Sequence, residues 1–119
     1  PFNNELVRIT LNGKELKEYF DRLARGEVRL MQVSGAKVQI QGQNVKSILV
    51  NDQPVEDDRK YSIVTLNYVT DHMPIYFGLE NDTRKIETIS PNARKVLLTT
   101  IRSSGVISSN VEGRIVIDK

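Results

Sequence analysis

The sequence predicts an α+β domain made mainly of antiparallel strands with two helices. Three observations predict this class: short segments of alternating apolar and polar residues, two stripes of apolar residues at helical spacing, and turn-forming residues between them. A length of 119 residues, with no internal repeat and no break in composition, predicts a single domain. Strands and helices that are not in strict alternation are typical of the α+β class.

The first strand is predicted near the N-terminus. Val7, Ile9 and Leu11 alternate with Arg8 and Thr10, as expected for a strand buried on one face. The Asn-Gly pair at 12–13 then ends the alternation.

A helix is predicted directly after this strand. Its buried stripe has the spacing i, i+3, i+4 and i+7, at Leu16, Tyr19, Phe20 and Leu23. Asn12 with Glu15 three residues later predicts a capping box, and Gly26 predicts the C-terminal end of the helix.

The next 40 residues favour β-structure. Strands are predicted over Val28–Val33, Lys37–Gln41, Val45–Val50 and Tyr61–Leu66. Turn residues separate them at 34–35, 42–44 and 51–54. The segment 68–89 has no clean period and is interpreted as mostly loop.

A second helix and a last strand complete the chain. Ser90-Pro91 predicts a helix start, with Ser as the cap and Pro at the first helical position. Its buried stripe would contain Leu97, Leu98 and Ile101, and Gly105 would end it. The final strand is predicted over Gly113–Ile117.

Composition excludes several function classes. The absence of cysteine excludes thiolate metal sites, iron–sulfur clusters and a cysteine nucleophile. A net charge of +2, with basic and acidic residues intermixed, argues against nucleic acid as a partner. No apolar run approaches the ~20 residues of a membrane span. His72 is the single histidine, so neither a two-metal centre nor a Ser/His/Asp triad is expected. The acidic run Glu56-Asp57-Asp58 is interpreted as a solvated turn.

One cluster of residues suggests a binding role. The rings of Tyr68, Tyr76 and Phe77 lie in the irregular segment, near the polar residues Asp71, His72, Asn81 and Asp82. Two interpretations remain open. The rings bind a ligand, because loops often carry functional groups, or they anchor the segment to the core.

Several short motifs, in order along the whole chain, resemble the C-terminal domain of the 5′-nucleotidases. That family typically reads P-F-G-N, L-x-G-x-x-L, Q-V-S-G, V-N-G-x-P-L and Y-x-V-x-T-N. The matching segments here are Pro1-Phe2-Asn3-Asn4, residues 11–16, 32–35, 50–54 and 61–65, followed by Gly113-Arg114-Ile115. The resemblance implies the fold of that domain over residues 1–119, incomplete at its N-terminus.

The resemblance also implies a set of substrate-binding residues. In the family, two aromatic rings sandwich the base of a nucleoside, and here Phe2 and Tyr76 fall at those positions. Asn4 falls on the motif Asn that bonds the edge of the base. Asp82 falls on the Asp that accepts hydrogen bonds from the ribose hydroxyls.

The chain departs from the family pattern before the second ring. The family has G-G-D-G there, and this chain has His72-Met73-Pro74-Ile75. Pro and Ile do not tolerate the positive φ values that a glycine loop permits, so we expect the segment to follow another path.

The function implied by the resemblance is recognition of a nucleoside or nucleotide in a 5′-nucleotidase-type phosphoric monoester hydrolase system. The domain would position the substrate for a metallophosphoesterase domain, in cis or as a separate chain, which would hold the divalent metals. The 119-residue chain itself is expected to have no catalytic residue, cofactor or metal, and no hydrolytic activity. The family implies an exported, periplasmic or extracellular protein of nucleotide catabolism. The alternative is a non-catalytic interaction or structural module that keeps the fold without the pocket.

Overall fold

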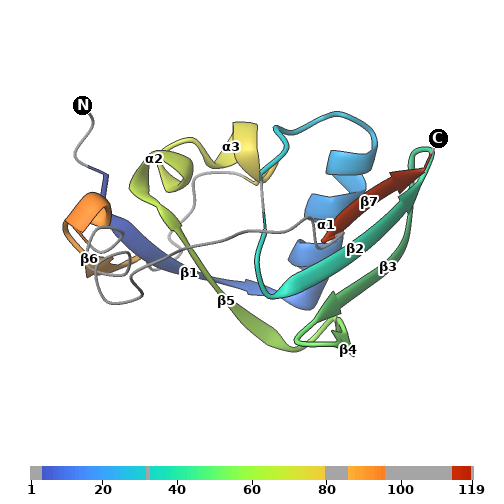
Figure 1. Ribbon diagram of the computed structural model, residues 1–119, viewed down its shortest axis with the longest axis horizontal. Helices are drawn as coiled ribbons and strands as arrows, with labels where there is room; N and C mark the ends of the chain where they lie inside the picture. The colour runs from blue at the N-terminus through green and yellow to red at the C-terminus, as the bar shows by residue number, and fades with distance from the viewer. Residues whose placement is uncertain (1–3, 32, 80–85, 96–113, 119) are drawn as a thin grey trace, which may run out of the picture.

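Strand β1 (Leu6–Asn12) is the middle strand of the first of two sheets. The computed structural model of the chain describes residues 4–31, 33–79, 86–95 and 114–118 (Figure 1). β1 pairs antiparallel with β5 (Lys60–Leu66) on one side and with β6 (Glu87–Ser90) on the other. Val7, Ile9 and Leu11 are at most 1% exposed, which confirms the predicted one-sided burial of this strand.

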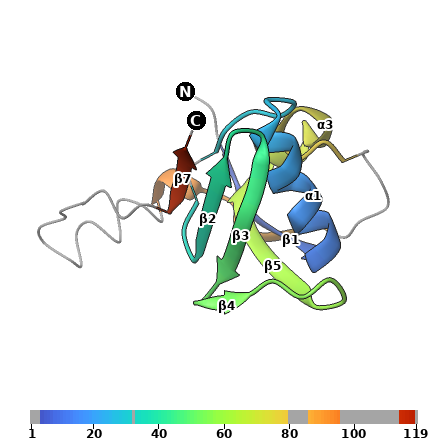
Figure 2. The ribbon, with the colours of Figure 1, turned by 90° about the vertical axis from the view of Figure 1, so that its right-hand side faces the viewer.

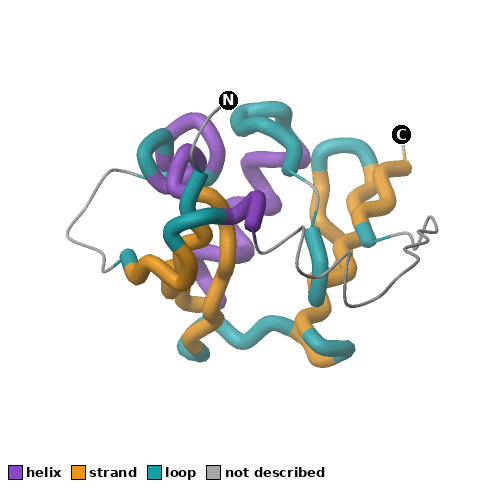
Figure 3. Tube along the Cα trace, turned by 60° about the vertical axis from the view of Figure 1, so that its left-hand side comes forward, coloured by secondary structure: helices purple, strands orange, loops and turns teal. Residues whose placement is uncertain are grey.

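The second sheet has four strands in the order β4 (Gln53–Pro54), β3 (Asn44–Val50), β2 (Ala36–Gln41) and β7 (Ile115–Asp118). β2 pairs antiparallel with β3 and parallel with β7. The β3–β4 hairpin turns through Asn51 and Asp52, whose φ angles of 50° and 63° are those of a two-residue turn with left-handed residues. Figure 3 shows the strands in two separate groups.

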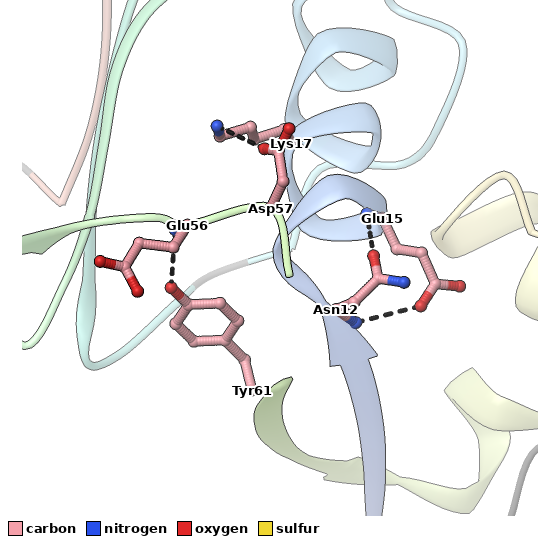
Figure 4. Close-up of polar contacts among 6 residues, drawn as sticks. All are labelled: Asn12, Glu15, Lys17, Glu56, Asp57 and Tyr61. Carbon is pink, nitrogen blue, oxygen red and sulfur yellow. Dashed lines mark hydrogen bonds and ion pairs between the residues drawn. The ribbon is translucent and has the colours of Figure 1, made fainter. Parts of the chain in front are cut away.

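Helix α1 (Gly13–Ala24) begins at the predicted capping box. The Glu15 amide donates to the Asn12 side-chain oxygen at 2.8 Å, and the Asn12 amide donates to the Glu15 carboxylate at 3.1 Å (Figure 4). At the other end, Gly26 has a φ of 74° and its amide donates to the Leu23 carbonyl, which confirms Gly26 as the end of the helix.

The acidic turn before β5 is attached to the start of α1. The Lys14 amide donates to the Asp57 carbonyl at 3.2 Å, and the Lys17 ammonium contacts the Asp57 carboxylate at 2.6 Å (Figure 4). The Glu56 amide donates to the Tyr61 hydroxyl at 2.9 Å. Both side chains of the Lys17–Asp57 pair are more than 40% exposed, so the pair contributes little net stability.

The hydrophobic core lies between α1 and the two sheets, and Figure 2 shows α1 beside β2 and β3. Its central members come from α1, both sheets and the segment after β5: Ile9, Leu11, Phe20, Val38, Ile40, Val69 and Phe77. This arrangement confirms the predicted α+β class with mainly antiparallel sheets.

Three expectations about individual elements were wrong. Residues 28–31 and 33 form no strand, although Val28, Met31 and Val33 pack against the core. The described part of the segment 68–89 is not mostly loop, because two helical turns and β6 make up most of it. Residues 93–95 are helical, but the helix does not begin at Pro91 with Ser90 as its cap, because Ser90 is the last residue of β6. The cap bond comes from Asn92, whose side chain accepts from the Lys95 amide at 2.9 Å. The stripe at 97–101, Gly105 and Gly113 lie outside the described residues.

Candidate functional site

Two short helical turns follow β5 and carry the candidate aromatic residues. They are α2 (Asn67–Thr70) and α3 (Met73–Tyr76). Val69, Met73 and Phe77 recur every four residues and are all buried, which fixes both turns on the core. Pro74 lies in the first turn of α3, where its missing amide hydrogen is not needed. The segment that replaces the family's glycine loop is therefore a helical turn.

Tyr68, His72 and Tyr76 form one connected group of rings on the outside of these turns, which we call the aromatic surface. The Tyr68 and His72 ring centroids lie 4.4 Å apart with an interplanar angle of 34°. The Tyr68 and Tyr76 centroids lie 6.1 Å apart, edge to face at 74°. Tyr68 is 47% exposed, so its ring does not serve to anchor the segment.

The two interpretations of the aromatic residues apply to different rings. Phe77 is 3% exposed and packs against Tyr19, with centroids 5.3 Å apart. It anchors the segment to the core. Tyr68 is exposed, and Tyr76 is half-buried against the edge of the core, so a flat ligand could stack on the exposed part of these rings.

His72 has a fixed orientation within the aromatic surface. Its Nδ1 lies 2.8 Å from the Tyr68 carbonyl oxygen. A carbonyl can only accept, so Nδ1 carries the proton, and in the neutral ring Nε2 is left as an acceptor. Within the part of the chain that the structure describes, no group of His, Asp or Glu side chains is suited to hold a metal ion.

The segment after α1 adds a positive charge to this surface. The Arg29 amide donates to the Ile75 carbonyl at 3.1 Å, and the Arg29 guanidinium carbon lies 5.9 Å from the centre of the Tyr76 ring. The predictions from sequence did not include Arg29. No motif marks it, and its contact with α3 depends on how the 25–31 segment crosses the fold.

Asn4 is held at the same end of the molecule as α2. The Glu5 amide donates to the Asn67 side-chain oxygen at 3.0 Å, and the Asn67 amide donates to the Glu5 carbonyl at 3.0 Å. The Asn4 carbonyl accepts from the Ala93 amide at 2.9 Å. The residue after Asn4 is thus bonded to the helical turn that carries Tyr68, whose ring contacts Tyr76.

Phe2 and Asp82 lie outside the described residues. The pairing of Phe2 with Tyr76 across a base, and the role of Asp82 at a ribose, therefore stay predictions.

A separate cleft of about 510 Å³ lies between the two sheets and α1, lined mainly by apolar side chains that include Phe20, Tyr61 and Phe77. The Tyr19 hydroxyl is buried in its wall and makes no hydrogen bond to a described residue. Burial raises the pKa of Tyr19 to about 12, an effect that the nearby Met31 backbone opposes. Neither Asn4 nor Tyr76, the two predicted binding residues that the structure describes, lines this cleft.

Within the described residues, no helix is long and apolar enough to cross a membrane.

The chain is similar to known proteins both in sequence and in fold. The family described as 5'-nucleotidase, C-terminal domain, matches residues 1–76. No curated protein sequence matches the chain. A 5'-nucleotidase precursor from Thermus thermophilus has a similar fold, with a TM-score of 0.80 and 21% identity, over 99% of this chain and 26% of that one.

A second similar structure is the NAD nucleotidase of Haemophilus influenzae. Its TM-score is 0.71 at 18% identity, over 99% of this chain and 25% of that one. The chain thus spans about a quarter of the length of these two solved structures. The match over residues 1–76, more than half of the sequence, shows that the chain belongs to the 5′-nucleotidase C-terminal domain family.

Proposed function

We propose that this domain recognises a nucleoside or nucleotide and positions it for a metallophosphoesterase domain, in cis or as a separate chain. The observation that carries the proposal is the arrangement at one end of the fold. Glu5, the residue after Asn4, is hydrogen-bonded to Asn67 at the start of α2, and the ring of the next residue, Tyr68, contacts Tyr76. Two of the four residues expected to bind substrate are thereby linked through a short chain of contacts.

The chemistry of these groups suits a nucleoside. An accessible aromatic face stacks on a base, and this stacking costs about 1–3 kcal/mol when it is lost in nucleic-acid-binding proteins. The Asn4 amide can both donate to and accept from a base edge. In the proposal, Phe2 supplies the second ring and Asp82 accepts from the ribose hydroxyls.

The proposed role is positioning, while hydrolysis is assigned to the other domain. Hydrolysis of a phosphate monoester needs a Lewis acid and an activated water. Divalent metals in the partner domain would supply both, and holding the nucleoside fixed would bring the phosphate to them. Family membership supports an exported, periplasmic or extracellular hydrolase system.

A second candidate is an interaction or structural module that has lost the pocket. The helical turn α3 favours it, because Pro74 and Ile75 remove the backbone freedom of the family's glycine loop. This candidate predicts that neither adenosine nor AMP binds.

Calorimetric titration of the chain with adenosine separates the two candidates. Phe2→Ala and Tyr76→Leu should each weaken adenosine binding by about 1–3 kcal/mol if the rings stack on the base. Val64→Ala is a matched control, because Val64 is 53% exposed on β5 and has no role in the proposed site. Absence of adenosine and AMP binding would favour the module without a pocket.

Phosphate release tests the division of labour between the domains. The chain should release no phosphate from AMP above background with Mg²⁺, Mn²⁺, Zn²⁺ or Co²⁺, and turnover should require a metallophosphoesterase domain. Metal-dependent release that His72→Ala abolishes would place catalysis in this domain and overturn the proposal.

A further inference from the structure

The Tyr76 side chain is half-buried against the edge of the core, and its ring has two further contacts within the described residues. The Arg29 guanidinium lies over the ring, with its carbon 5.9 Å from the ring centre, and Tyr68 meets it edge to face at 6.1 Å. A cation within about 6 Å of a ring centre is attracted by the negative face of the ring. These contacts restrict which part of the ring a ligand can reach.

Arg29 is held in place by the backbone rather than by its own side chain. Its amide donates to the Ile75 carbonyl at 3.1 Å, directly before Tyr76 in α3. Among the described residues, no hydrogen bond or ion pair to the Arg29 guanidinium is present. The ring of Tyr76 is therefore its one specific contact in this part of the chain.

We propose that Arg29 is a positioning residue, which packs on one face of Tyr76 so that the opposite face is presented to an aromatic ligand. This inference rests on the proposed function, because it takes the ligand to stack on Tyr76. The guanidinium fixes the tilt of the Tyr76 ring. The backbone of α3 cannot do this, because it fixes only where the Tyr76 side chain begins. The ligand, Tyr76 and Arg29 then form three stacked layers.

The contact itself can be tested without ligand. Nuclear magnetic resonance of the free chain should show ring-current shifts of the Arg29 side-chain protons, and Tyr76→Leu should remove them. Arg59 is an internal reference, because its guanidinium carbon lies 5.6 Å from the Tyr61 ring and should keep its shifts in that variant. Arg29 shifts that do not respond to Tyr76→Leu would overturn the inference, whatever the chain binds.

The role of the contact is tested with adenosine as the probe. Arg29→Ala should weaken adenosine binding about two- to five-fold, the range of an exposed cation–π contact, and Arg29→Lys should restore part of it. Arg59→Ala should leave the affinity unchanged. In the Tyr76→Leu background, Arg29→Ala should have no further effect, because the ring that it positions is gone.

The outcomes separate this inference from the proposed function. Adenosine binding to the wild-type chain that Arg29→Ala does not weaken would overturn the positioning role and leave the proposed function intact. An effect of Arg29→Ala that persists fully without the Tyr76 ring would also overturn it. If the wild-type chain binds no adenosine while the Arg29 shifts are present, the proposed function fails, and the positioning role fails with it.

Discussion

Asn67→Ala should loosen the N-terminal segment that carries Asn4 while leaving the fold intact. The Asn67 side chain accepts from the Glu5 amide at 3.0 Å, and this bond is lost in the variant. The reciprocal bond from the Asn67 amide to the Glu5 carbonyl, also 3.0 Å, uses only backbone atoms and is retained. One of two bonds across this contact is therefore removed.

The expected increase in local opening at Glu5 follows from the loss of this one hydrogen bond. A single hydrogen bond of this kind contributes about 1 kcal/mol net, so local opening at Glu5 should become about five-fold more frequent. Amide hydrogen exchange of Glu5 measures this opening directly. Asn67→Asp keeps an acceptor oxygen and is the matched control. If Asn4 contacts the base as proposed, adenosine affinity should fall in Asn67→Ala and not in the control.

Two results would refute this reasoning. Unchanged exchange at Glu5 in Asn67→Ala would show that the side-chain bond does not hold the segment. Faster exchange with unchanged adenosine affinity would show that the segment is held by this bond but that its position does not matter for the ligand.

Three further predictions concern stability. Asn12→Ala should cost about 1 kcal/mol in thermal unfolding because it removes the capping bond to Glu15, and Asn12→Asp should retain most of it. Gly13→Ala should lower the free energy of unfolding by about 3 kcal/mol or more, because the added Cβ would overlap the Glu56 carbonyl. Gly26→Ala should lower it by only about 1–2 kcal/mol, because Gly26 has a φ of 74° but open space around it. Equal losses for the two variants in urea unfolding would contradict this. Tyr19 has a folded pKa raised from 10.0 to about 12, so its contribution is fully present below pH 10 and is lost as pH rises toward 12, by about 2–3 kcal/mol in total. Tyr19→Phe should abolish that alkaline loss and, since the hydroxyl makes no bond to a described residue, should not destabilise at pH 7.

The elements that the sequence predicted well are those whose signal is local. The alternation in β1 and the capping box of Asn12 and Glu15 each depend only on residues close together in the sequence, and both are confirmed. The strand expected over Val28–Val33 failed for a non-local reason. Val28, Met31 and Val33 do pack on the core, but the edge of β2 that is not paired with β3 is paired with β7, which comes from the other end of the chain. The spacing of apolar residues alone cannot show which segment pairs with the edge of a sheet.

The residues of the candidate site also differ in whether a local sequence signal marks them. Asn4 and Tyr76 could be selected from motifs, because their residue types and order along the chain carry the resemblance. Arg29 could not be selected, because its contact with Tyr76 exists only once the 25–31 segment lies against α3. Predictions for Phe2 and Asp82 rest on the motifs alone.

The replacement of a glycine loop by α3 has opposite consequences for the two candidate functions. A glycine loop leaves the following ring mobile, so a ligand must pay to order it when it binds. The buried side chains of Met73 in α3 and Phe77 directly after it hold the turn on the core, and Tyr76 lies between them in sequence with a fixed backbone. With the tilt of the ring held by Arg29, as proposed above, Tyr76 favours tight binding where its other face points at the ligand and prevents binding where that face points elsewhere. The same rigidity that weakens the likeness to the family pattern therefore makes the orientation of a single ring decisive for whether this domain binds a nucleoside.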